Sequence, residues 1–309
     1  MIKDTKLSPD AGYALYTYYN YVKAWIINLE NSFGTGKSGM DRFLANIKSS
    51  SDFANLKNDT GCTTEVRAHY LRGKFTLISM MKFPIDDHPE LSISANMWLP
   101  VQAYYAIHGV GLSVLAVLKQ RPKNHRAFLT CFANIICRYL PSPLSACCDG
   151  GPDISSFTFN NISTSHNQVA RQSNIANPKY SQGDHFIGKS LSTTRGKNIK
   201  DLCDKARQQH RGGCKRRNLC RTERANICHK LPPTTICDFI YRMRVRSNYE
   251  DPDMYLFAYE NVQDAASHYK DLLHFTDIIV TGMECVIEKK IGTREMLELR
   301  DLVALSKHQ

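Results

Sequence analysis

The stretch MWLPVQAYYAIHGVGLSVLAVL, residues 97–118, decides the fold class of this chain. Its apolar residues occur on every side of a helix, which is typical of a helix buried all round. Gly109 and Gly111 allow a neighbouring backbone to approach closely. Its most apolar part, 101–118, is interrupted by polar residues and is shorter than a comfortable bilayer span. The stretch therefore predicts a central buried helix and no membrane partner.

Long amphipathic helices are expected on both sides of this stretch. A serine, a proline and an aspartate at residues 8–10 are typical of a helix start, and apolar residues then alternate by four and three up to Gly34. The same spacing fills 262–287, between an Asn261 cap and Gly292. The chain is therefore predicted to be mainly α.

The remaining segments give weaker signals. Helical patterns cover 43–53 and 124–139, whereas 66–81 fits a helix or a strand, and no repeat or βαβ unit is found. Residues 153–184 are rich in Ser, Asn, Thr and Gln, and few large apolar residues follow in 189–230. The expected organisation is an N-terminal helical region (1–96), a helical bundle (97–140 and 234–309) and a partly irregular insertion (141–233).

The positive charge is concentrated in the second half of that insertion. The net charge is +11, and 13 Lys and Arg against 3 Asp and Glu place +10 of it between residues 189 and 230. Such an excess favours a polyanionic partner such as RNA, although a solvated charge run has the same composition. Aromatic residues are not interleaved, so contacts would be electrostatic. The expected nucleic-acid contacts are Lys215, Arg216, Arg217, Arg221 and Arg224.

The cysteines and the N-terminus indicate a reducing compartment. No apolar leader follows the first residues, so a cytoplasmic location is expected, and the 11 cysteines are interpreted as mostly reduced thiols. The basic segment contains residue types that bind zinc, but their spacing matches no common zinc site and leaves metal binding open. They are Cys203, His210, Cys214, Cys220, Cys228 and His229. No metal or other cofactor is predicted.

The sequence YRMRVRSNYED, residues 241–251, places three arginines two positions apart. On a helix one face would carry Arg242, Arg246 and Tyr249, and another Arg244, Asn248 and Asp251. Arginine forks match phosphate oxygens, so a phosphate site is one interpretation, and a solvated helix with Arg to acid pairs is the other. His108 is a further candidate, provided that it faces a cleft and not the core.

These segments together resemble the HEPN superfamily. The resemblance rests on Ala103-Tyr-Tyr-Ala-Ile-His108, on the following helix with His125, on Arg244-Val-Arg-Ser-Asn-Tyr249, and on the long helix after it. It looks closest to small prokaryotic HEPN proteins with a Tyr-Tyr-Ala helix, and it covers about a third of the chain.

The resemblance implies a helical bundle that forms a homodimer, or joins a larger complex, in a bacterial defence or toxin and antitoxin system. Many HEPN members are metal-independent ribonucleases with an arginine followed by a histidine, but here Tyr249 stands where the histidine is expected. A phenol is a poor general base at neutral pH, so His108 or His125 would have to move the proton. Otherwise the chain would be a catalytically silent binding or assembly subunit.

Overall fold

The computed structural model describes residues 9–151, 157–162, 180–208, 218–257, 259 and 261–305. Helices dominate this part of the chain, which confirms the prediction of a mainly α protein. One hydrophobic core collects buried residues from the N-terminal region, the central helix and the C-terminal helices, among them Trp25, Tyr70, Leu99, Tyr104 and Phe275.

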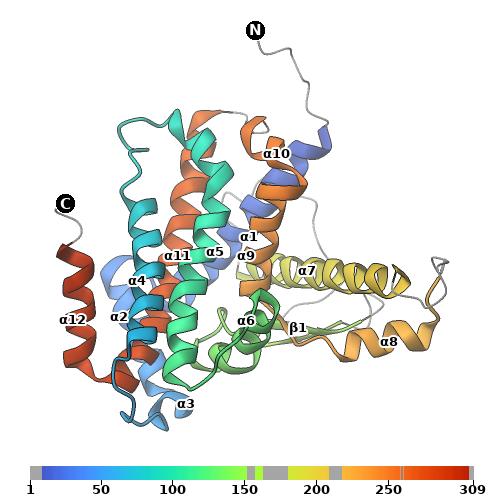
Figure 1. The fold of residues 1–309 in the computed structure, drawn as a ribbon. Helices are drawn as coiled ribbons and strands as arrows, with labels where there is room; N and C mark the ends of the chain where they lie inside the picture. The colour runs from blue at the N-terminus through green and yellow to red at the C-terminus, as the bar shows by residue number, and fades with distance from the viewer. Residues whose placement is uncertain are drawn as a thin grey trace.

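The centre of the bundle is α5 (Leu91–Val117), which runs beside α4 (Thr64–Met81) and α11 (Val262–Ile291) (Figure 1). Segment 66–81 is therefore a helix. A Cβ on Gly109 would lie 2.7 Å from the backbone of Gly73 in α4, so these glycines allow α4 and α5 to touch. The predicted close approach is confirmed at Gly109, whereas Gly111 makes room for the Phe128 ring.

The predicted ends of the two long amphipathic helices are confirmed. The first helix, α1 (Pro9–Phe33), ends before Gly34, whose φ of +85° suits a residue without a Cβ. At the start of α11 the Asn261 side chain accepts a hydrogen bond from the backbone of Asp264. Shorter helices complete these regions: α2 (Gly36–Ser49), α3 (Ser51–Ala54) and α12 (Thr293–Leu305).

The segment after α5 folds back against that helix. Asn124 caps α6 (His125–Cys131), accepting a hydrogen bond from the backbone of Ala127 over 2.9 Å. A wide π turn, η1 (Phe132–Ile136), and a tight 3-10 turn, η2 (Cys137–Tyr139), then replace the single helix expected over 124–139. Leu140 is extended because proline follows it.

A small antiparallel sheet packs against α7 and α9. Its order is β2-β1-β3, with β1 (Cys147–Gly150) between β2 (Phe157–Asn160) and β3 (Thr234–Thr235). Cys147 faces Asn160 on one side and Thr235 on the other. Thr235 also begins α9 (Ile236–Val245), because Asp238 accepts hydrogen bonds from the backbone and the hydroxyl of Thr235. The sheet therefore fixes where α9 starts.

The described part of the insertion 141–233 forms regular elements. Its main element is α7 (Tyr180–Gln208), which packs on α1 and α9 and buries Ile187 and Leu191 fully. The shorter α8 (Arg221–His229) follows. Leu191, Ile199 and Cys203 of α7 belong to the core, so the basic stretch 189–230 is not wholly a solvated charge run.

Arg195 shows how a polar helix can pack inside a protein. Its side chain is fully buried and donates hydrogen bonds to the carbonyl oxygens of Gly150 and Pro232 over 2.7 and 2.8 Å. It also pairs with Asp149 over 2.8 Å. A buried arginine is tolerated only when its donors are satisfied, and here they tie α7 to the sheet. Arg195, one of the 13 Lys and Arg residues between 189 and 230, is thus a structural residue.

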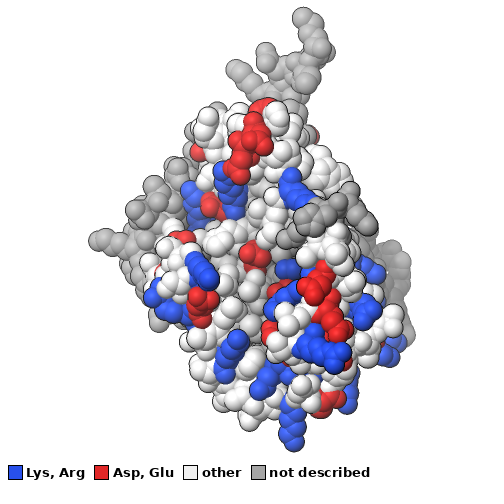
Figure 2. Space-filling model, turned by 90° about the vertical axis from the view of Figure 1, so that its left-hand side faces the viewer, with Lys and Arg blue, Asp and Glu red and all other residues white. Residues whose placement is uncertain are grey.

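After α9 the chain makes a π turn, η4 (Arg246–Glu250), and a short helix, α10 (Pro252–Phe257), before α11. Helix α5 is long and apolar enough to cross a membrane, but 67% of its most apolar window is buried inside the protein, as in the core helix of a water-soluble bundle. Basic and acidic side chains are interspersed on the face of the molecule shown in Figure 2.

Candidate functional site

Two histidines from different helices meet beside α5. His108 lies one turn after Tyr104 on α5, and His125 is the first residue of α6. Their ring centroids are 4.9 Å apart, with an angle of 50° between the rings. The Tyr104 hydroxyl lies 2.8 Å from Nδ1 of His125, so Nε2 is the nitrogen of His125 left for another partner. The structure therefore places two partly buried imidazole rings side by side.

Arg244 brings a positive charge to the same place from α9. One guanidinium nitrogen donates a hydrogen bond to the Tyr105 hydroxyl over 3.0 Å. The guanidinium carbon lies 5.1 to 5.4 Å from the ring centroids of Tyr104, Tyr105 and Tyr241. We call these residues the His-Arg cluster; its members are Tyr104, Tyr105, His108, His125, Tyr241 and Arg244.

Arg244 has no acidic partner among the residues that the structure describes. The residue is only 8% exposed, and its Nε is buried without a hydrogen-bond partner. A buried charge is usually paired or hydrogen-bonded, and rings with one hydroxyl satisfy a guanidinium incompletely. The cluster is therefore electrostatically suited to an anion such as a phosphate.

The surroundings keep both imidazoles neutral at physiological pH. Burial lowers the pKa of His108 to about 4, helped by His125, by His69 and Arg72 of α4, and by Arg244. Burial also lowers the pKa of His125, with the charge of Arg244 as the second cause. A bound anion would raise both pKa values, because it favours the charged form of each ring.

The three arginines of the 241–251 segment separate onto two faces. Arg242 and Arg246 both lie over the Tyr18 ring of α1, at 5.6 and 5.4 Å, and share a face as predicted. Arg246 pairs with Asp251 over 3.2 Å. Asp251 was expected beside Arg244, but the π turn η4 adds a residue and changes the register after Val245. Only Arg244 faces the histidines.

Tyr249 and Asn248 are not part of the His-Arg cluster. Tyr249 is 68% exposed on the π turn, and Asn248 is half-buried. The cluster obtains its imidazoles from α5 and α6 instead. Sequence reasoning had singled out His108 and suggested His125, and its two motifs contained Tyr105 and Tyr241 without giving either a role. It missed His69 and Arg72, which carried no signal.

The predicted nucleic-acid contacts are only partly described. Arg221 and Arg224 are exposed on α8, whereas Lys215, Arg216 and Arg217 lie outside the described residues. The candidate zinc ligands are also divided: Cys203 and Cys228 are buried, Cys220 and His229 are exposed, and His210 and Cys214 lie outside. Across the described ranges no three His, Cys, Asp or Glu side chains gather to hold a metal ion.

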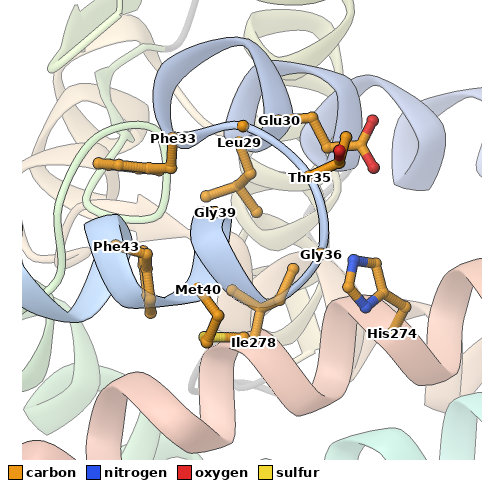
Figure 3. Close-up of a pocket in the computed structure, with 11 residues that line it drawn as sticks. Leu29, Glu30, Phe33, Thr35, Gly36, Gly39, Met40, Phe43, His274 and Ile278 are labelled. Carbon is orange, nitrogen blue, oxygen red and sulfur yellow. The ribbon is translucent and has the colours of Figure 1, made fainter.

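A small cavity of about 40 Å³ lies elsewhere, between α1, α2 and α11 (Figure 3). Leu29, Phe33, Phe43 and Ile278 supply apolar walls, and Glu30 and His274 lie toward one edge. It has room for about one or two water molecules, and it is too small for a substrate. The His-Arg cluster is the stronger candidate.

A scan against protein-family models and searches of curated proteins and solved structures find no match to this chain.

Proposed function

We propose that this chain binds RNA at the His-Arg cluster and cleaves it, with imidazoles making the proton transfers. The observation that carries the proposal is the pair of imidazoles 4.9 Å apart beside Arg244, a buried arginine without an acidic partner in the described part of the chain. Cleavage by the neighbouring 2′-hydroxyl needs a base, an acid and a cation near one phosphate. All three are supplied by side chains of this cluster.

The different surroundings of the two histidines support different roles for them. His108 is the more deeply buried and has the lower pKa, so it is neutral and takes the proton of the 2′-hydroxyl. His125 is easier to protonate and gives a proton to the departing 5′-oxygen. In its protonated form Nδ1–H of His125 donates to the Tyr104 hydroxyl, which orients the ring.

The bonds and protons then balance. The 2′-oxygen forms a bond to phosphorus while the bond from phosphorus to the 5′-oxygen breaks. One proton goes to His108 and another leaves His125, so the products are a 2′,3′-cyclic phosphate and a 5′-hydroxyl. Arg244 neutralises the charge that builds on the phosphate oxygens, a role typically worth about 10² to 10³ in rate for one preorganised donor.

A second candidate is an RNA-binding or assembly subunit that does not cleave. The lowered pKa values of both histidines favour it, because neither ring is protonated at neutral pH before a ligand binds. The HEPN resemblance accommodates both candidates, and adds the expectation of a homodimer in a bacterial defence or toxin and antitoxin system. Both remain proposals.

Incubation of the purified chain with single-stranded RNA in EDTA separates the two candidates. Cleavage that is lost in His108→Asn and in His125→Asn supports the ribonuclease. Arg242→Lys is the matched control, because Arg242 lies over Tyr18 and away from the cluster. Binding without cleavage by the wild-type chain supports the second candidate, and cleavage that survives both histidine substitutions contradicts the first.

A further inference from the structure

A larger cavity lies directly beside the His-Arg cluster. It has a volume of about 270 Å³ and is formed by α6, α7, α9 and the loop before β3. In Figure 1, α7 crosses α9, and α6 lies below the crossing. Tyr241 belongs to both features: it lines the cavity, and its ring centroid is 5.1 Å from that of Tyr104 and 6.0 Å from that of His125.

In α6 and in α9, a residue that lines the cavity directly follows a residue of the cluster. Arg126, which follows His125, and Val245, which follows Arg244, both line the cavity. Because Tyr241 borders both the cavity and the cluster, a ligand that contacts His125 and Arg244 through one group has its next group beside the cavity. The volume lies near the lower end of the ~300–1,000 Å³ typical of small-molecule sites.

The lining suits a flat, neutral, polar ring. Leu129, Leu202 and Leu231 provide apolar surface, and Tyr241 provides an aromatic face. Asn198 of α7 is half-buried in this wall, and its amide makes no hydrogen bond to another described residue. An amide offers a donor and an acceptor side by side, as the edge of a nucleobase requires.

The charges around the cavity indicate which end of a nucleotide enters. Two carboxylates, Asp201 and Asp238, line it, so a phosphate inside would meet like charges. Asp201 lies 3.6 Å from Lys197, and Asp238 is occupied in capping α9. The exposed side chains of Arg126 and Lys205 also line the cavity and balance the two carboxylates. A cavity with balanced charges suits the neutral base, whereas Arg244, without an acidic partner among the described residues, suits the phosphate outside.

We propose that this cavity holds the nucleoside next to the cleaved phosphate and selects its base. The inference rests on the proposed function, and it names the substrate as single-stranded RNA, because a base must leave the stack to enter. Stacking on Tyr241 supplies sequence-tolerant affinity, and the Asn198 amide supplies the choice of base.

Two substitutions test this subsite in the whole chain of 309 residues. Cleavage of a set of RNA oligonucleotides that differ only in the base next to one cleavable phosphate gives kcat/KM for each base. Asn198→Ala should reduce the ratio of kcat/KM between the best and the worst base by about tenfold. The reason is that the base loses the amide that distinguishes its polar edge. Leu202→Trp should fill the cavity and raise KM about tenfold or more. Asn226→Ala, an exposed asparagine on α8, is the matched control.

Direct binding separates failure of the subsite from failure of the proposed function. The probes are the four ribonucleoside 3′-monophosphates, titrated into wild-type and Leu202→Trp protein, with circular dichroism to confirm that each variant is folded. Weaker binding to the folded Leu202→Trp variant supports the subsite even when the wild type does not cleave RNA. Unchanged binding overturns the subsite. An unchanged ratio of kcat/KM between bases in an Asn198→Ala variant that still cleaves RNA also overturns it.

Discussion

The imidazoles of His108 and His125 lie with their ring centroids 4.9 Å apart, although they belong to different helices. The chain brings them together by reversing after α5, where Asn124 caps α6 and starts it at His125. Tyr104 holds His125 through its hydroxyl, and Phe128 packs against the ring of His108 at 4.5 Å. The pair is thus fixed by packing on both sides, as preorganised catalytic groups are.

Under the proposed mechanism, the pH profile of RNA cleavage should have an acidic optimum. In the free protein His108 must be neutral, which requires a pH above its pKa of about 4, and His125 must be protonated, which requires a pH below its lowered pKa. The value of kcat/KM should therefore rise above pH 4 and fall before pH 7. The groups that face the pair are His69, Arg72 and Arg244, and all of them act in the same direction.

Initial rates of RNA cleavage from pH 3.5 to 8.5 at constant ionic strength measure this profile. Arg72→Gln should move the acidic limb to higher pH, because it removes one of the charges that lower the pKa of His108. A profile that keeps rising through pH 8 would assign the chemistry to other groups.

Arg244→Lys should lower cleavage by about 10² to 10³, because a lysine keeps the charge but loses the planar fork that reaches both Tyr105 and a phosphate. Arg242→Lys should leave the rate within about twofold, since that guanidinium lies over Tyr18. Steady-state kinetics with one RNA substrate measure both. Equal losses in the two variants would mean that the arginines stabilise the fold in the same way.

Acid should destabilise the protein through its buried histidines. Burial lowers the pKa of His268 to about 3, against about 6.5 in the unfolded chain, so the unfolded state binds more protons between these values. The stability due to His268 is therefore complete above pH 6.5 and falls as the pH drops toward 3, by at most ~1.4 kcal/mol per pH unit.

Urea unfolding of the wild type and of His268→Gln, measured from pH 4 to 7, isolates this contribution as a difference. The comparison is needed because the raised pKa of Asp238, about 6, acts in the opposite direction. The difference in unfolding free energy between the wild type and His268→Gln should shrink toward low pH. A difference that is independent of pH would show that His268 contributes only through packing and its bond to Tyr259.

The salt dependence of RNA binding should report the exposed arginines of α8. Removal of Arg221 and Arg224 together should reduce the slope of log K against log salt by about 1 to 2. Each phosphate contact that is lost lowers the number of counterions that RNA binding releases. Arg294→Ala on α12 is the control, because this exposed arginine is paired with Glu298 over 3.4 Å. An unchanged slope in the double variant would remove α8 from the RNA interface.

The ends of the two long helices α1 and α11 were predictable from the sequence, because local signals place them. Gly34 and Gly292 end helices in left-handed conformations, and Asn261 caps α11. Helix α7 was missed because its pattern is polar: Thr194 and Arg195 are fully buried in it and satisfied by hydrogen bonds. Composition alone cannot distinguish such a helix from a solvated charge run.

The site was predictable residue by residue but not as an arrangement. His108 and Arg244 were visible as chemistry-bearing residues, yet the choice of Arg244 over its neighbours depends on α1, which covers the other face through Tyr18. The exclusion of Tyr249 depends on the π turn η4, whose extra residue has no sequence signal here.

The most direct test of the central claim uses a DNA strand that contains a single ribonucleotide, incubated with the protein in EDTA, with analysis of both product ends. The account predicts one cut, on the 3′ side of the ribonucleotide, leaving a 2′,3′-cyclic phosphate and a 5′-hydroxyl, and no cut in the His125→Asn variant. Cuts at deoxynucleotides, or a 5′-phosphate on the product, would contradict attack by the 2′-hydroxyl between His108, His125 and Arg244.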